Sequence, residues 1–496
     1  MTPTSDSGVR APGIGAETSY TAVAAPARGR GLVAAYMGIT ALVLALLMVF
    51  GLLMKSSQAG VITIPPNRFY QLLTAHGIGM VAISGLGGAG VMWFFLSRYV
   101  DLSPAILLAN LVCFLLGVVL VLGGIFIGGF AAAWTFLFPL PAQSQGIWGP
   151  GAAAAYLIGV LVVGVGFLLL FLDIGRAIIG KYGSLGRALG WPQAFGKSTE
   201  DAPPPAVVAS TVVTIINIPA IAVGAVILTM SLVNAYAPGF RVNALLAKNL
   251  IYFFGHIFIN STIYMAVIGV YEILPTFTGR AWKSSKPFLL AWTATMLMVM
   301  AVYPHHLFMD YANPTWASVL GQILSYTSTL PVLAVTGAAT LANVYRSGMK
   351  WNMTAGLLFA SIMGWSVGIV PAVIDGTIAI NRVMHNTLWV PGHFHTYLLL
   401  GVVSMLFGFM YFLGLSTGAT DSALDRAGFW MYVVGTLAFA SAFLAAGAAS
   451  VPRRWAVHLD PWIGVDRIGA AFALVVVAGA VVFVLKFLRR ARAISA

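Results

Sequence analysis

The chain has 496 residues, of which 60% are hydrophobic and only 8% are charged, so it is too apolar to be a water-soluble protein. We interpret the formal net charge of +13 as the Lys and Arg excess that membrane proteins carry on their cytoplasmic side, and not as a sign of nucleic-acid binding. The single cysteine, Cys113, excludes thiolate clusters, a Cys-x-x-Cys-His haem attachment and a two-cysteine copper centre, so any metal must have nitrogen or oxygen ligands.

Hydropathy predicts an all-α, polytopic membrane protein with a bundle of twelve transmembrane helices, embedded in lipid over residues 31–490. Residues 1–30, rich in small and polar residues, are expected to form a disordered cytoplasmic tail, and residues 491–496 a second cytoplasmic tail. The expected spans are about 31–54, 69–98, 105–129, 151–178, 205–236, 247–276, 287–309, 318–345, 352–376, 385–415, 427–450 and 467–489.

The distribution of basic residues predicts the orientation of the bundle. With the N-terminus inside, most of the 26 Lys and Arg residues fall on the inner side of the membrane. We therefore expect both termini in the cytoplasm, in a bacterial-type cytoplasmic (inner) membrane.

Six of the eight histidines share one depth in this topology. They lie in the outer parts of four spans, roughly 10–15 Å below the outer surface at 1.5 Å per residue. Unrelated histidines in a bundle interior would not share a depth, whereas the ligands of a metal site would. These six residues are His76 in span 2, His256 in span 6, His305 and His306 in span 7, and His393 and His395 in span 10.

The spacing of the histidines indicates how they divide between metals. His305 and His306 are adjacent and can share one metal only where the helix end is distorted, for which Pro304 supplies a reason. With His256 they form a three-imidazole set suited to copper. His76 and His395 remain as two axial ligands of a low-spin haem, and His393 as the single axial ligand of a second, high-spin haem.

This arrangement, with the stretch Asn-Thr-Leu-Trp-Val-Pro-Gly-His-Phe-His, resembles the catalytic subunit I of the haem–copper oxidase superfamily, and most closely its B-type branch. The resemblance implies two haems and one copper, held as above. It also implies that Phe394 lies between the haems, that His385 meets a propionate of the high-spin haem, and that Arg453 and Arg454 neutralise haem propionates.

The sequence departs from the oxygen-reducing members at the position four residues after the first copper histidine. Those members carry a tyrosine there, cross-linked to a histidine and able to donate an electron and a proton, whereas this chain has Asn260. Tyr303, two residues before His305, is the candidate for a relocated tyrosine. Asn260, Tyr303 and His393 are therefore the candidate catalytic residues.

The B-type proton route from the cytoplasmic side is also interrupted. Valines occupy three of its relay positions, which argues against proton uptake from inside and against pumping. These valines are Val267, Val332 and Val335. An aspartate four residues before His385 in the family is replaced by Asn381.

These departures lead us to expect a respiratory electron-transport enzyme that reduces NO to N2O. The alternative is a cytochrome c oxidase that reduces O2 to water, with or without proton pumping. A secondary transporter is a remote alternative, because the chain lacks repeated halves with broken helices. Electrons must come from a partner at the outer face, which we expect to be a subunit II, a c-type cytochrome or a cupredoxin.

Overall fold

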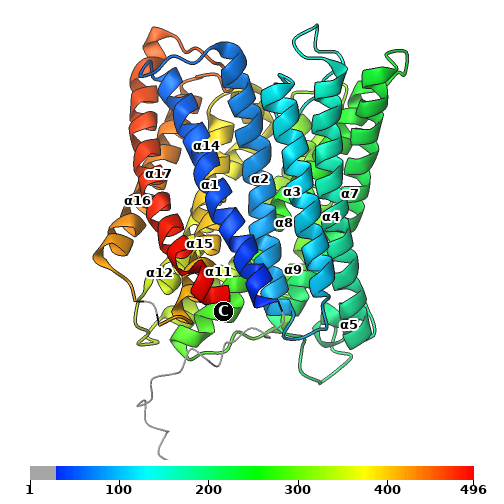
Figure 1. Ribbon diagram of the computed structural model, residues 1–496. Helices are drawn as coiled ribbons and strands as arrows, with labels where there is room; N and C mark the ends of the chain where they lie inside the picture. The colour runs from blue at the N-terminus through cyan, green and yellow to red at the C-terminus, as the bar shows by residue number, and fades with distance from the viewer. Residues whose placement is uncertain (1–28, 419, 496) are drawn as a thin grey trace, which may run out of the picture.

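The computed structural model describes residues 29–418 and 420–495 (Figure 1). The tail expected at 1–30 therefore lies almost entirely outside the described residues. At the other end, the helix that forms the last span continues to Ser495, through the residues expected to form the second tail.

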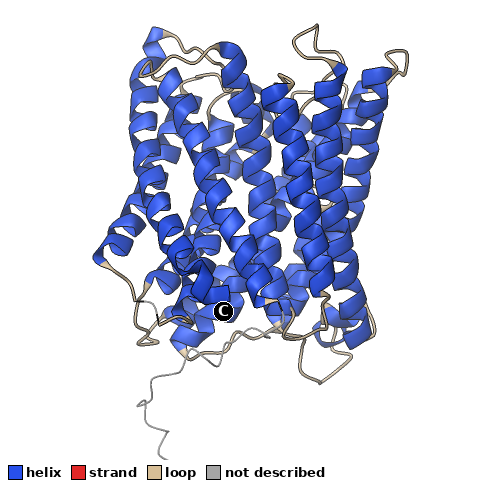
Figure 2. Ribbon diagram, in the orientation of Figure 1, coloured by secondary structure: helices blue, strands red, loops and turns tan. Residues whose placement is uncertain are grey.

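Within the described residues the protein is helical and contains no β-strand, only one isolated bridge between Thr387 and Pro452 (Figure 2). The elements are α1 (Arg30–Gln58), α2 (Pro66–Leu96), α3 (Pro104–Leu122), η2 (Gly123–Ile127), α4 (Pro150–Tyr182), α5 (Leu185–Ala188), α6 (Trp191–Ala194), α7 (Pro205–Tyr236), α8 (Ala244–Thr278), α9 (Lys286–Val299), η3 (Tyr303–Leu307), α10 (Thr315–Thr327), α11 (Leu330–Val344), α12 (Met353–Asp375), α13 (Ile378–Met384), α14 (Trp389–His395), η4 (Thr396–Val403), α15 (Ser404–Leu415), α16 (Ala423–Ala448) and α17 (Asp460–Ser495).

These elements form 12 helices that are long and apolar enough to cross a membrane, as the hydropathy pattern predicts. Their bounds agree with the expected spans to within four residues, except in the last span. The tenth span begins at Trp389 and not at 385, so His385 lies in the connection after α13. The last span begins at Asp460, seven residues before the expected start at 467.

The arrangement of the spans explains why the histidines are internal. Helices α17, α1 and α2 pack against one another in succession, as do α3, α4 and α7 (Figure 1). The most apolar windows of α2, α8 and the tenth span are 83%, 83% and 94% buried, the largest shares in the bundle. Side chains from these three helices therefore face other helices and not lipid.

Two departures from α-helical geometry lie at the histidines. Pro304 lacks the amide hydrogen that an α-helix would need, and residues Tyr303–Leu307 form a 3₁₀ turn, which confirms the predicted distortion. Immediately after His395, residues Thr396–Val403 form a π-helical segment. Such segments are rare and occur mostly at functional sites.

The short helix α14 is held against α16 by close backbone approach. A Cβ on Gly447 would lie 2.0 Å from the Trp389 amide nitrogen, so this position needs glycine, and a Cβ on Gly392 would lie 3.0 Å from the Leu444 nitrogen, which would have to shift by a few tenths of an ångström. The connections beside them are also tied, since the Leu388 amide donates to the Val451 carbonyl at 2.9 Å. The helix that carries two of the histidines is thus fixed in position.

Candidate haem and copper site

One cavity of about 440 Å³ lies in the middle of the bundle and brings the candidate residues together. Its size falls in the range of sites that hold cofactors and drug-sized ligands. Its wall includes His76, His256, His305, His306, His385, His393, Phe394, His395, Asn260, Arg453 and Arg454. Of the residues singled out from the sequence as site residues, all but Tyr303 line this cavity.

His76 of α2 and His395 of α14 face one another across the cavity. Their ring centroids are 6.2 Å apart and their planes differ by 28°. Two imidazoles that coordinate one metal from opposite sides at about 2 Å have centroids roughly 6 Å apart. The observed separation therefore fits a bis-imidazole haem.

Hydrogen bonds to the main chain orient both rings for this role. The Nδ1 atoms of His76 and His395 lie 2.7 Å from the Leu47 carbonyl and 2.6 Å from the Pro391 carbonyl. A carbonyl can only accept, so each Nδ1 must carry the proton, and each Nε2 keeps its lone pair for a metal.

The three-imidazole set predicted for copper is also assembled. One nitrogen from each of His256, His305 and His306 lies within 4.8 Å of the others, and this is the one such group of metal-ligating side chains found among the described residues. His306 Nε2 is 3.1 Å from both His256 Nδ1 and His305 Nε2. Three imidazole nitrogens at such spacing suit one copper ion.

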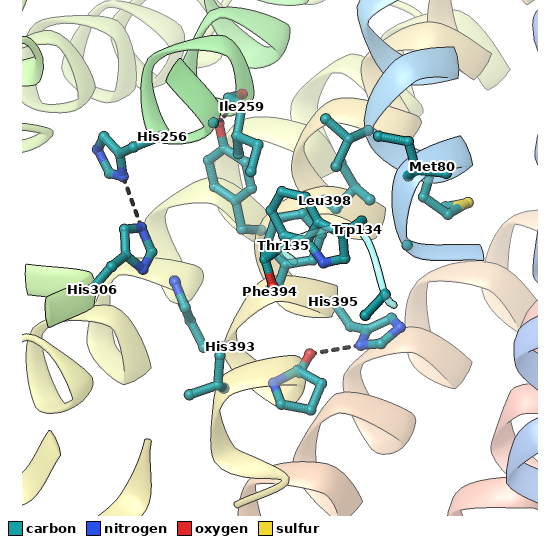
Figure 3. Close-up of a pocket in the computed structure, with 18 of the residues that line it drawn as sticks. Met80, Trp134, Thr135, His256, Ile259, His306, His393, Phe394, His395 and Leu398 are labelled. Carbon is teal, nitrogen blue, oxygen red and sulfur yellow. Dashed lines mark hydrogen bonds between the residues drawn. The ribbon is translucent and has the colours of Figure 1, made fainter. Parts of the chain in front are cut away.

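His393 and His395 leave α14 in different directions (Figure 3). His393 points toward His306, while His395 turns to the opposite side, with Phe394 between them. A haem held by His393 would therefore have one face toward the three-imidazole set. This fits the expected pairing of a single-histidine haem with copper.

The part of the cavity next to the connection between α16 and α17 is cationic. Arg454 donates from Nη2 to Thr135 Oγ1 at 2.9 Å, and neither Arg453 nor Arg454 forms a salt bridge within the part of the chain described. Burial and the neighbouring Arg454 lower the pKa of Arg453 to about 10. Burial, together with the two guanidinium groups, lowers the pKa of His385 to about 3. Arg453 faces the Asp375 carboxylate but forms no salt bridge with it, and a largely buried cation without a salt bridge is costly, so Arg453, Arg454 and His385 fit haem propionates.

Asn260 touches the copper set directly. Its amide Nδ2 lies 2.7 Å from Nε2 of His256, one helical turn before it. If His256 binds copper through Nδ1, its Nε2 carries the proton, and the amide presents its oxygen to that nitrogen. Asn260 thus occupies the position from which a phenol would otherwise contact His256.

Tyr303 lies away from the cavity. Its hydroxyl donates to Asn249 Oδ1 at 3.1 Å, and its side chain does not line the cavity. The structure therefore does not bring the predicted relocated tyrosine to the site.

The inner route is apolar where the sequence suggests. Val267 and Val332 are fully buried, and below them Tyr271 hydrogen bonds to Thr336 at 2.8 Å. Tyr271 is therefore hydrogen-bonded to α11. No polar side chain at positions 267 and 332 extends this contact toward Asn260.

The sequence reasoning missed several cavity residues. Ser325 lies 2.8 Å from Nδ1 of His305, and the ring of Tyr252 stacks on His306 with centroids 4.9 Å apart and planes at 15°. For Tyr252 a signal existed, because it precedes His256 by four residues and so shares its helix face. Nothing in the sequence connects Ser325 with His305, which is twenty positions away.

A buried charged group lies beside the His76–His395 pair. Lys55 of α1 lines the cavity and contacts Asp466 of α17 at 2.5 Å, while His458 contacts the other carboxylate oxygen at 2.6 Å. The signal for this group in the sequence is weak, since Lys55 and Asp466 each lie one residue outside an expected span.

The fold and the cavity define a multi-pass membrane protein with an internal, imidazole-lined cofactor site. Comparison with known proteins gives the family. Residues 31–482 match the family model "Cytochrome C and Quinol oxidase polypeptide I", and the chain belongs to this family of haem–copper oxidase subunits I. It is therefore a subunit of a haem–copper oxidoreductase of respiratory electron transport.

Individual relatives are distant. The chain is 25% identical over 438 residues to "Cytochrome c oxidase polypeptide 1" of Halobacterium salinarum, covering 83% of this chain and 69% of that one. It is 24% identical over 452 residues to "Ubiquinol oxidase subunit 1" of Acetobacter aceti, covering 84% and 63%. A solved haem–copper terminal oxidase dimer has the same fold, with a TM-score of 0.73 at 18% identity over 93% of this chain and 84% of that one.

Proposed function

We propose that this chain is the catalytic subunit of a membrane nitric oxide reductase that converts two NO molecules to N2O and water. The observation that carries the proposal is Asn260, whose amide lies 2.7 Å from the His256 ring nitrogen. Splitting the O–O bond requires four electrons almost at once, and a phenol at this position supplies one of them. Coupling two NO molecules requires only two electrons. An amide can orient a bound diatomic molecule by hydrogen bonding but supplies no electron.

In this proposal each side chain of the cavity has a defined role in holding a haem or the copper. When bound, the two haems and the copper would supply the electrons and the metal site at which the gas reacts. His76 and His395 would hold the low-spin haem, and His393 would hold the high-spin haem. The copper is held by His256, His305 and His306. Arg453, Arg454 and His385 bind propionates and keep the haem edges oriented, and Phe394 fills the space between the haems.

Electrons enter from a partner at the outer face in this proposal. The arginine pair lies in the connection between α16 and α17, which is the outer side if both termini are cytoplasmic. The partner is a subunit II, a cupredoxin or a c-type cytochrome. The names of the relatives include both cytochrome c and ubiquinol oxidases, so the donor class is decided by experiment.

Protons come from the outer side in this proposal. The two buried valines above Tyr271 interrupt the inner route, since a methyl group cannot relay a proton. Turnover therefore moves no net charge across the membrane through this subunit.

Oxygen reduction is the second candidate, and one observation favours it. Tyr252 places a phenol ring against His306, which makes it the tyrosine in direct ring contact with the copper set. If this phenol donates an electron and a proton, the loss of tyrosine at position 260 is compensated.

The deciding experiment measures haem and copper content, then NO and O2 consumption, on one sample of the purified complex. We expect two haems and one copper per chain, faster NO than O2 turnover, and no membrane potential beyond leak in proteoliposomes. Rapid O2 reduction with proton ejection would overturn the proposal. In that case, loss of the O2 activity in Tyr252→Phe would identify the phenol, with Tyr303→Phe as the matched control.

A further inference from the structure

The cavity wall carries one carboxylate. Asp375 is the last residue of α12 and the only Asp or Glu among the described residues that line the cavity. The rest of the polar wall consists of imidazoles, amides, hydroxyls and cationic side chains. A carboxyl group is one of the few side chains that both accept and release protons during catalysis near neutral pH.

Asp375 is held in a defined position. Asn381, which is only 2% exposed, donates from Nδ2 to the Asp375 main-chain carbonyl at 2.8 Å and to its Oδ1 at 3.1 Å. Arg453 is the charged group that faces the carboxylate. The second oxygen, Oδ2, accepts no hydrogen bond from the described residues and is available to water in the cavity.

The carboxylate lies next to a contact that leads to the copper set. Gly376 packs so closely on Ser325 that an added Cβ would lie 2.7 Å from the serine Cβ. Ser325 Oγ is 2.8 Å from Nδ1 of His305 and 2.6 Å from the Gly321 carbonyl. Since the carbonyl only accepts, the serine hydroxyl donates to it and accepts from His305.

Asp375, Asn381 and Ser325 lie on the side of the bundle from which protons enter in the proposed function. Helix α12 ends on the same side of the bundle as the outer ends of the histidine-bearing helices, and Asp375, Asn381 and Ser325 all line the cavity. The inner route lacks polar side chains at Val267 and Val332, so this wall offers the carboxylate that the inner route lacks.

We propose that Asp375 is the proton-transfer residue of an uptake route from the outer side to the gas site, along the wall formed by Asn381 and Ser325. This inference rests on the proposed function insofar as protons enter from outside. The carboxylate takes a proton from outer water and releases it to cavity water, which carries it to the oxygen atom that leaves as water. Two protons pass for each N2O formed, and Asp375 ends each cycle unchanged.

The test uses the complete purified complex with Asp375→Asn, Asp375→Glu and the matched control Asp460→Asn. Asp460 is an exposed aspartate at the start of α17 and does not line the cavity. In Asp375→Asn we expect native haem and copper content and native electron transfer between the haems in a single turnover. Proton uptake, followed with a pH indicator, should slow by about 100-fold, the low end of what a lost acid–base group costs. Asp375→Glu should restore most of the rate, and Asp460→Asn should match the native protein.

Native proton uptake in a metal-replete Asp375→Asn protein would overturn the inference. If that variant does not assemble, Asn381→Leu provides a second test, because it removes a donor that stabilises the carboxylate and should shift the pH–rate profile to higher pH. An unshifted profile would also overturn the inference. Proton uptake can be followed with NO or with O2 as the substrate. If the proposed substrate is wrong, the native protein itself will show this, and the comparison between native protein and Asp375 variants remains valid.

Discussion

The hydrogen bond between Asn260 and His256 makes a quantitative prediction about copper binding. Copper on Nδ1 of His256 leaves a proton on Nε2, and the Asn260 amide, whose Nδ2 lies 2.7 Å from that nitrogen, accepts this proton when the amide is flipped to present its oxygen. Asn260→Leu keeps a similar side-chain volume but accepts no hydrogen bond. A buried N–H without a partner costs about 1–3 kcal/mol. This agrees with the roughly 10–100-fold loss of metal affinity that removal of such outer-shell partners typically causes.

The assay is competition for copper, independent of turnover. The reduced complex is titrated with a Cu(I) chelator of known affinity, and the copper retained is measured by elemental analysis. We expect the Asn260→Leu complex to release copper at about 10–100-fold lower chelator concentration than the native one. Asn260→Asp, which still accepts the hydrogen bond, should retain copper at least as well as the native protein.

The control is Asn249→Leu, the same substitution three helical turns earlier in α8, where the amide contacts Tyr303 and does not line the cavity. It should leave copper affinity unchanged. If Asn260→Leu held copper within twofold of the native protein, His256 would not use Nδ1, and the assignment of the amide as its partner would be wrong.

Three further outcomes are expected. His76→Leu should abolish the low-spin haem spectrum and leave CO binding at the other haem, so a normal low-spin band would exclude this ligand. His305→Ala should leave both haem spectra largely intact but remove copper and turnover, and full activity without copper would exclude the copper site. Lys55→Met leaves Asp466 with only His458 as a partner, and breaking a buried pair costs roughly 3–5 kcal/mol. Its thermal unfolding midpoint should fall, and the added Asp466→Asn should recover most of it; no recovery would show that the lysine acts by packing alone.

Helix positions could be predicted from this sequence because lipid leaves few alternatives. A span needs about 20 apolar residues, and the chain alternates such runs with short polar connections. The histidines of the cavity could be grouped in advance because topology assigns each one a depth. Span 10 begins four residues later than expected, at Trp389, because residues 385–388 form the connection between α13 and α14, and their sequence does not show where that connection ends.

The partners of the histidines could not be predicted in the same way. Leu47 and Pro391 act through main-chain carbonyls, which any residue possesses, so no side-chain pattern marks them. The contact of Ser325 with His305 joins α10 to η3 and depends on how the two segments pack. Tyr303 is adjacent in sequence to the copper histidines, yet the 3₁₀ turn directs it to Asn249 and away from the cavity.

The single short helix α14 has a consequence for how enzymes of this design can diversify. In the proposed assignment one seven-residue segment supplies a ligand to each haem, and the two ligands are two residues apart. The gap that an electron crosses between the haems is then set by local helix geometry and by the clamp of Gly392 and Gly447 against neighbouring backbone. Residues on α8, such as Asn260, belong to a different helix. Substitutions on α8 can therefore change which gas is reduced, while the distance for electron transfer between the haems stays the same.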